Sequence, residues 1–175
     1  LAAGLLYGLQ CLVHWTQMAG ITRFSDRFML LFVVGITVAF VVALAVVIWR
    51  DRKTTHRAVG TRALNAVFMG AGLANLVLCS VFGLVSWQTG SQTIWLLYPV
   101  TTCVLLGLAW FVAYMVRKRA WLASVAGGWF VTAVGLGLLV GRGDVATYVL
   151  LLGLALLVLM ALPGWAMMRR AGMVE

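Results

Sequence analysis

Long apolar runs separated by short polar interruptions dominate the chain and predict its elements. The run Leu150–Leu162 is continuously apolar rather than alternating, which favours helices over the strands of a membrane barrel. A helix needs about 20 apolar residues to cross the hydrocarbon core, and its backbone groups pair within the segment. Six stretches fit this description: residues 1–19, 28–49, 63–87, 93–116, 120–140 and 145–168. The predicted fold is therefore all-α, a bundle of six transmembrane helices.

Composition supports this prediction. The 175 residues are 64% hydrophobic and 10% charged, with a mean hydropathy of +1.07. A water-soluble domain is closer to half apolar and a quarter charged, so a soluble domain, a disordered chain and a disulfide scaffold are excluded. The connections between the apolar stretches are too short for a soluble domain. Residues 1–175 are predicted to form a single transmembrane helical domain.

The basic residues predict the orientation in the membrane, because Lys and Arg favour the cytoplasmic side in short loops. Of the 13, ten lie on the side of the second loop and three on the other. The second loop forms a basic cluster of Arg50, Arg52, Lys53, Arg57 and Arg62. Both termini are therefore expected in the cytoplasm, and the membrane is expected to be a bacterial-type inner membrane.

The net charge of +9 sits at the helix ends rather than on one exposed face. Basic residues in that position meet anionic lipid headgroups, each contributing about 1 kcal/mol near such a surface. The expected partners are therefore an anionic lipid bilayer and other membrane protein subunits or a second copy of the chain, and no nucleic acid.

The acidic residues argue against several kinds of chemistry. All four lie in predicted loops or in the tail: Asp26, Asp51, Asp144 and Glu175. Ion-coupled carriers usually place an ionisable group at membrane depth, and intramembrane aspartyl proteases need paired carboxylates there. The sequence also lacks the H-E-x-x-H and G-x-S-x-G motifs of zinc and serine hydrolases. We therefore expect no catalytic residues and no enzymatic activity.

A polar stripe is predicted on the first helix. It consists of Tyr7, Gln10, His14 and Gln17, which are three, four and three residues apart and so share one face. Polar side chains in lipid find partners on neighbouring helices, so helix–helix contact is one interpretation. The other is a binding site or a water-lined path centred on His14.

Two rows of small and polar residues predict a helix-contact seam. The third helix contributes one row and the fifth helix the other: Gly72, Asn75, Cys79 and Ser86, then Ser124, Gly128 and Thr132. Small residues let helix backbones approach closely, and a deep amide such as Asn75 must find a partner. A ligand groove is the alternative interpretation of the same rows.

Prolines interrupt two of the helices. Pro99 follows Tyr98 and precedes Thr101 and Thr102, a pattern that fits either a tolerated kink or a broken-helix substrate site. Pro163 is expected to bend the last turns of the sixth helix.

The sequence indicates no metal and no cofactor. Its three cysteines lie in spans at unrelated spacing, without a C-x-x-C pair, and read as small apolar residues. His14 is the only histidine in a predicted span, so one chain cannot supply a bis-histidine haem site.

These features predict a non-catalytic membrane protein that acts as a subunit or regulatory partner within a membrane assembly. The alternative is an oligomeric channel or facilitator for a small solute, in which the polar stripe and the Asn75 row line the path.

Overall fold

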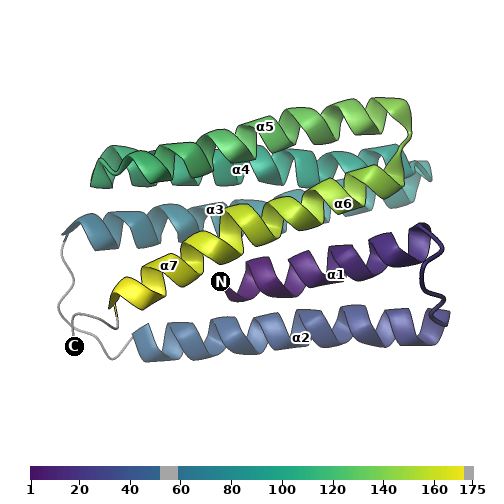
Figure 1. Cartoon of the computed structure of the whole chain (residues 1–175), viewed down its shortest axis with the longest axis horizontal. Helices are drawn as coiled ribbons and strands as arrows, with labels where there is room; N and C mark the ends of the chain where they lie inside the picture. Colours follow the sequence, from purple (N-terminus) through teal and green to yellow (C-terminus); the bar gives the residue numbers. More distant parts are fainter. Residues whose placement is uncertain (52–58, 172–175) are drawn as a thin grey trace. The chain divides into compact units, whose positions relative to one another are not determined.

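The computed structural model describes residues 1–51 and 59–171, and these are helical apart from short turns (Figure 1). The elements are listed here in chain order: α1 Ala2–Met18, α2 Asp26–Asp51, α3 Val59–Thr89, α4 Gln92–Arg117, α5 Ala120–Arg142, α6 Val145–Leu156, the π-helix η1 Leu157–Ala161, and α7 Leu162–Ala171. Five helical segments are long and apolar enough to cross a membrane, with α6, η1 and α7 forming one of them. The all-helical class is confirmed for the described residues.

The predicted span at residues 1–19 is not among these five segments. Helix α1 has 17 residues, two fewer than the predicted stretch 1–19 and below the length of the other five. At 1.5 Å per residue it reaches about 26 Å, short of the roughly 30 Å hydrocarbon core. The count of six spans therefore stays a prediction.

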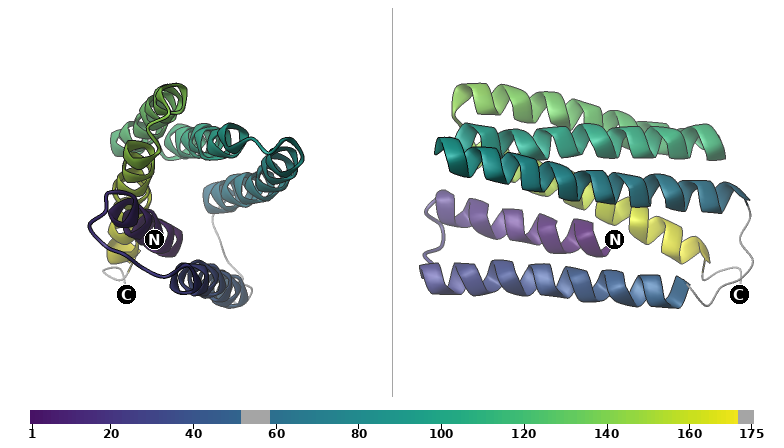
Figure 2. Two further views of the ribbon diagram at one scale, coloured as in Figure 1. Left: turned by 90° about the vertical axis from the view of Figure 1, so that its right-hand side faces the viewer. Right: turned by 180° about the vertical axis from the view of Figure 1, so that it is seen from behind.

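The chain divides into two compact units. Unit 1 comprises residues 1–55 and 145–175, and unit 2 comprises residues 56–144. In unit 2, α4 packs against both α3 and α5, and each neighbour runs antiparallel to it (Figure 2). In unit 1, α1 packs mainly against α6 and η1 and more sparsely against α2.

Local sequence explains where the helices begin and end. The Ser25 hydroxyl accepts a hydrogen bond from the Phe28 amide at 3.3 Å, which caps the first turn of α2. Gly90, Gly143 and Lys118 adopt positive φ angles of 65°, 72° and 51° in the turns that follow α3, α5 and α4. Glycine adopts this left-handed conformation without steric cost, whereas Lys118 is strained.

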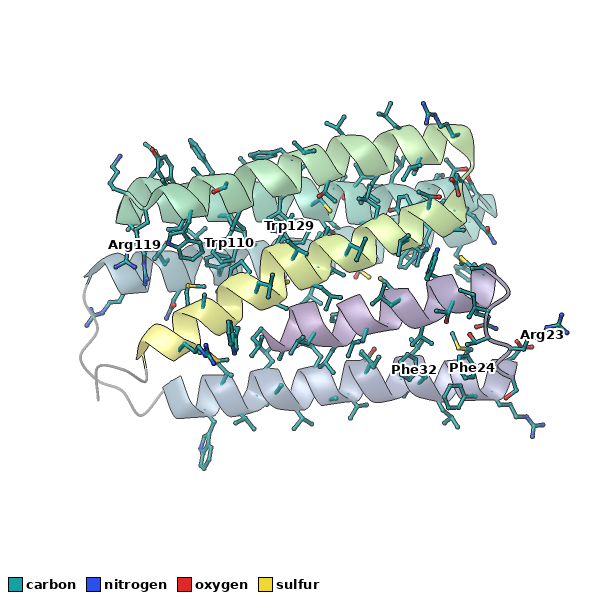
Figure 3. The ribbon with its side chains drawn as sticks, viewed as in Figure 1. Arg23, Phe24, Phe32, Trp110, Arg119 and Trp129 are labelled. Atoms are coloured by element: carbon teal, nitrogen blue, oxygen red, sulfur yellow. The ribbon has the colours of Figure 1, made fainter. Side chains whose placement is uncertain are left out.

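Aromatic side chains pack against one another in both units. At the start of α2, the ring of Phe28 stacks on Phe24, which precedes the helix, and on Phe32, with centroids 4.9 and 6.1 Å apart. Figure 3 labels Phe24 and Phe32 at this end of α2. In unit 2, the buried Trp110 packs edge-on against Phe68 of α3 at 5.3 Å. The Phe68–Trp110 contact helps hold α3 against α4 by burying apolar area.

Candidate functional site

A polar cluster joins the middle of α3 to the first half of α4. The Tyr98 hydroxyl donates to Asn75 Oδ1 at 3.2 Å, and the Thr102 hydroxyl donates to the same oxygen at 2.8 Å. All three side chains are partly buried. Asn75 thus has its carbonyl oxygen satisfied across a helix–helix contact, as a deep amide in a membrane requires.

Pro99 and two threonine hydroxyls lie close together in the first half of α4. Proline has no backbone N–H, so one hydrogen bond of the helix is lost one turn earlier. The Thr101 and Thr102 hydroxyls both donate to the Tyr98 carbonyl, at 2.8 and 3.0 Å. The Thr102 proton is therefore shared between this carbonyl and Asn75.

Two aromatic rings pack against the ring of Tyr98. Trp95 stacks on the Tyr98 ring with centroids 5.4 Å apart, and Phe82 lies 6.4 Å away. The cluster is held in a fixed geometry by packing as well as by hydrogen bonds.

The side-chain nitrogen of Asn75 differs from the side-chain oxygen in its hydrogen bonding. The structure gives Asn75 Nδ2 no hydrogen-bond partner among the described residues. The nitrogen is also not fully enclosed, because it is absent from the buried unpaired atoms. Two amide protons in the middle of an apolar helix pair therefore have unused donor capacity.

The predicted row on α3 separates in the structure. Asn75 belongs to the cluster and Cys79 lies beside Tyr98. Ser86 donates to the Ser91 carbonyl at 2.9 Å and so stabilises the turn between α3 and α4. Gly72 is exposed, and a Cβ built there would meet nothing within 4 Å.

The predicted row on α5 uses its hydroxyls within its own helix. Ser124 is exposed and donates to the carbonyls of Ala120 and Trp121, and the buried Thr132 donates to the Gly128 carbonyl at 2.8 Å. A contact between this row and the α3 row is not among the packing contacts of the described helices.

All four residues of the predicted polar stripe lie in α1, and each side chain is partly buried. His14 Nδ1 lies 2.9 Å from the Gln10 carbonyl, which can only accept, so Nδ1 is the donor of this hydrogen bond. Gln17 donates to the Phe24 carbonyl at 3.4 Å, and the Tyr7 ring packs edge-on against Phe40 of α2. The side-chain oxygen of Gln10 is buried without a partner among the described residues.

The basic cluster is only partly described. Arg52, Lys53 and Arg57 lie outside the described residues, while Arg50 falls in the last turn of α2 and Arg62 near the start of α3. At the α4–α5 turn, Arg117, Lys118 and Arg119 are all exposed.

Two shallow grooves were found on the described residues, and both are lined by apolar side chains and glycine. One, of about 430 Å³, follows α5 along Phe130, Val134 and Leu138. The other, of about 180 Å³, lies between α3 and α4. The described residues contain no group of three or more His, Cys, Asp or Glu side chains that could hold a metal ion.

The sequence analysis missed a close contact of α1 with α6 and the following π-helix η1. A Cβ at Gly4 would lie 2.7 Å from the backbone nitrogen of Ala161, and one at Gly8 would lie 2.8 Å from Leu157. Gly153 of α6 faces the same contact, since its Cβ would meet Cys11 at 2.9 Å. The signal was present as the spacing of Gly4 and Gly8, four residues apart, which is the small-xxx-small pattern of packed membrane helices.

The fold and these contacts define an all-helical protein with several helices that can cross a membrane. Comparison with protein-family models, with curated proteins and with solved structures found no match. Its function is therefore inferred from the residues and their arrangement.

Proposed function

We propose that this chain is a non-catalytic integral membrane protein that acts as a subunit or regulatory partner within a membrane assembly. One observation supports the proposal: several polar side chains of the spans make hydrogen bonds within and between helices. Tyr98 and Thr102 bind Asn75 across α3 and α4, and Thr132 bonds within α5. The two grooves, by contrast, are lined by apolar residues and glycine.

The proposed orientation places both termini in the cytoplasm of a bacterial-type cell. Within unit 2, Phe68 meets Trp110 and Gly83 meets Trp95, so the beginning of α3 and the end of α4 lie at the same end. This end carries the exposed Arg62 and the basic α4–α5 turn. The concentration of basic residues there supports a cytoplasmic assignment.

A co-purification experiment tests the proposal. The tagged chain is extracted from its native membrane in a mild detergent, and its mass is measured by light scattering and native mass spectrometry. The expected result is a complex of defined stoichiometry, containing other membrane subunits or further copies. A lone monomer in several mild detergents would overturn the proposal.

A flux measurement separates the proposal from the channel alternative. The purified chain is reconstituted into vesicles and tested for swelling in gradients of small neutral solutes. We expect no flux above that of protein-free vesicles. Saturable solute entry would refute the assembly role and favour a facilitator.

A further inference from the structure

We infer that the α4–α5 turn of unit 2 binds the headgroup of an acidic phospholipid. The described basic residues at this end of unit 2, here called the basic end, are Arg62, Arg117, Lys118 and Arg119, and all four side chains are exposed. Figure 3 labels Arg119 and Trp110 at this end. The inference goes beyond the assembly role, because it requires only that the helices of unit 2 cross a membrane.

The charge of the basic end is not neutralised within unit 2. Residues 56–144 contain a single carboxylate side chain, that of Asp144. Helix α5 begins directly after Arg119 and ends at Arg142, so Asp144 lies at the opposite end of this helix. A counter-charge for the basic end therefore has to come from outside unit 2. Phosphate oxygens are strong acceptors for Arg and Lys side chains.

An aromatic layer beneath the basic end indicates its depth in a membrane. The ring of Trp110 lies 5.3 Å from that of Phe68 and 6.3 Å from that of Trp121, so the layer joins α3, α4 and α5. Arg62 precedes Phe68 by six residues, and Arg117 follows Trp110 by seven, which is about 9 and 10 Å along the helices. Tryptophan favours the membrane–water interface, so the cations beyond it lie at the level of the lipid phosphates.

The length of α4 agrees with this depth. Its 26 residues extend about 39 Å, whereas the hydrocarbon core is about 30 Å thick. The end of α4 therefore reaches the headgroup layer, where phosphates are present whatever else the chain binds. This availability favours a lipid headgroup over an acidic protein segment as the source of the counter-charge.

Lys118 has a backbone conformation that glycine adopts more easily. Its φ is 51°, whereas glycine occupies the positive-φ position in the turns after α3 and α5, at Gly90 and Gly143. A side chain with a Cβ disfavours this left-handed conformation. Glycine at position 118 would be less strained, so the lysine contributes something other than stability to the turn. Its positive charge between Arg117 and Arg119 is that contribution.

Lipid titration followed by native mass spectrometry tests the site. The purified chain in a neutral detergent is titrated with phosphatidylglycerol and, separately, with phosphatidylcholine. We expect phosphatidylglycerol to bind at least about tenfold more tightly, and Lys118→Gly to weaken its binding about fivefold, the effect of one charge near an anionic surface. Lys118→Arg keeps the charge, and Arg142→Gln lies at the other end of α5, so both should retain the parent affinity.

Unfolding of the same variants separates loss of charge from loss of fold. Without acidic lipid, Lys118→Gly should unfold at a higher detergent concentration than the parent chain, because the strain of the left-handed lysine is removed. The expected variant is therefore more stable but binds the acidic lipid more weakly. A variant that is less stable than the parent would overturn the argument from Lys118.

Three other results would overturn the inference. Equal affinity for the two lipids would show that the basic end does not recognise the headgroup charge. Displacement of phosphatidylglycerol by an equal concentration of inorganic phosphate would identify a free anion as the occupant. A complex of defined stoichiometry that shows no lipid preference would refute the headgroup site and leave the assembly role in place.

Discussion

Replacing Gly4 by alanine is expected to loosen the docking of α1, because a methyl group has no room there. Its Cβ would lie 2.7 Å from the Ala161 nitrogen and 2.8 Å from the Leu156 carbonyl oxygen, both backbone atoms. Carbon atoms in ordinary contact are about 3.5–4.0 Å apart, so the helices must separate by about 1 Å.

The magnitude follows from two opposing effects. Overpacking of a tight contact costs about 1–3 kcal/mol, and the upper half applies here because backbone atoms cannot rotate away. Alanine recovers about 1 kcal/mol of helix propensity relative to glycine. The expected net loss for Gly4→Ala is therefore about 1–2 kcal/mol of unfolding free energy.

Two matched glycine variants allow the stability change of Gly4→Ala to be compared. Gly8→Ala should lose less, because its nearest contacts at 2.8 and 2.9 Å are side-chain atoms of Leu157 that can move. Gly35→Ala on α2 meets nothing within 4 Å and should gain up to about 1 kcal/mol. The sign should thus reverse between Gly4 and Gly35.

Equilibrium unfolding in mixed micelles measures these changes. The protein is titrated with sodium dodecyl sulfate and followed by tryptophan fluorescence and by helical circular dichroism. The reasoning is refuted if Gly4→Ala is as stable as the parent chain, or if Gly35→Ala loses more stability than Gly4→Ala.

Three other predictions concern the α3–α4 contact, the α4–α5 contact and the orientation in the membrane. Asn75→Leu should lower the unfolding free energy by about 1–2 kcal/mol, and an unchanged thermal midpoint would contradict this. Gly107→Ala should cost about 1–2 kcal/mol because its Cβ would lie 2.8 Å from the Phe130 ring, and Phe130→Leu should restore part of the loss in the same titration. In sealed cells lacking the native cysteines, an impermeant thiol reagent should label Arg23→Cys and spare Arg119→Cys; the reverse pattern would invert the orientation.

Hydropathy predicted the helices well and their ends less well. The second stretch was expected from residue 28, but α2 begins at Asp26, and α3 begins at Val59 rather than at residue 63. Hydropathy reports where the hydrocarbon can lie, whereas a helix begins where its first amides are capped. Ser25 provides that cap for α2 outside the apolar stretch.

The faces of the helices were much harder to predict than their existence. In a soluble helix, polar residues mark the exposed face, but lipid-facing and protein-facing positions of a span are both apolar. Gly70 and Gly72 illustrate this: the sequence analysis placed Gly72 in the seam, and Gly70 lines the α3–α4 groove. The partners of Asn75 on α4 could likewise not be paired with it from spacing within one helix.

The glycines of the spans differ in whether a close contact offsets their cost to the helix. Each costs about 1 kcal/mol of helix propensity relative to alanine. At Gly4, Gly8 and Gly153 the cost is offset by close packing of α1 against α6, because a Cβ there would collide with the neighbouring helix. At Gly70 a Cβ meets nothing, so no described contact offsets the cost.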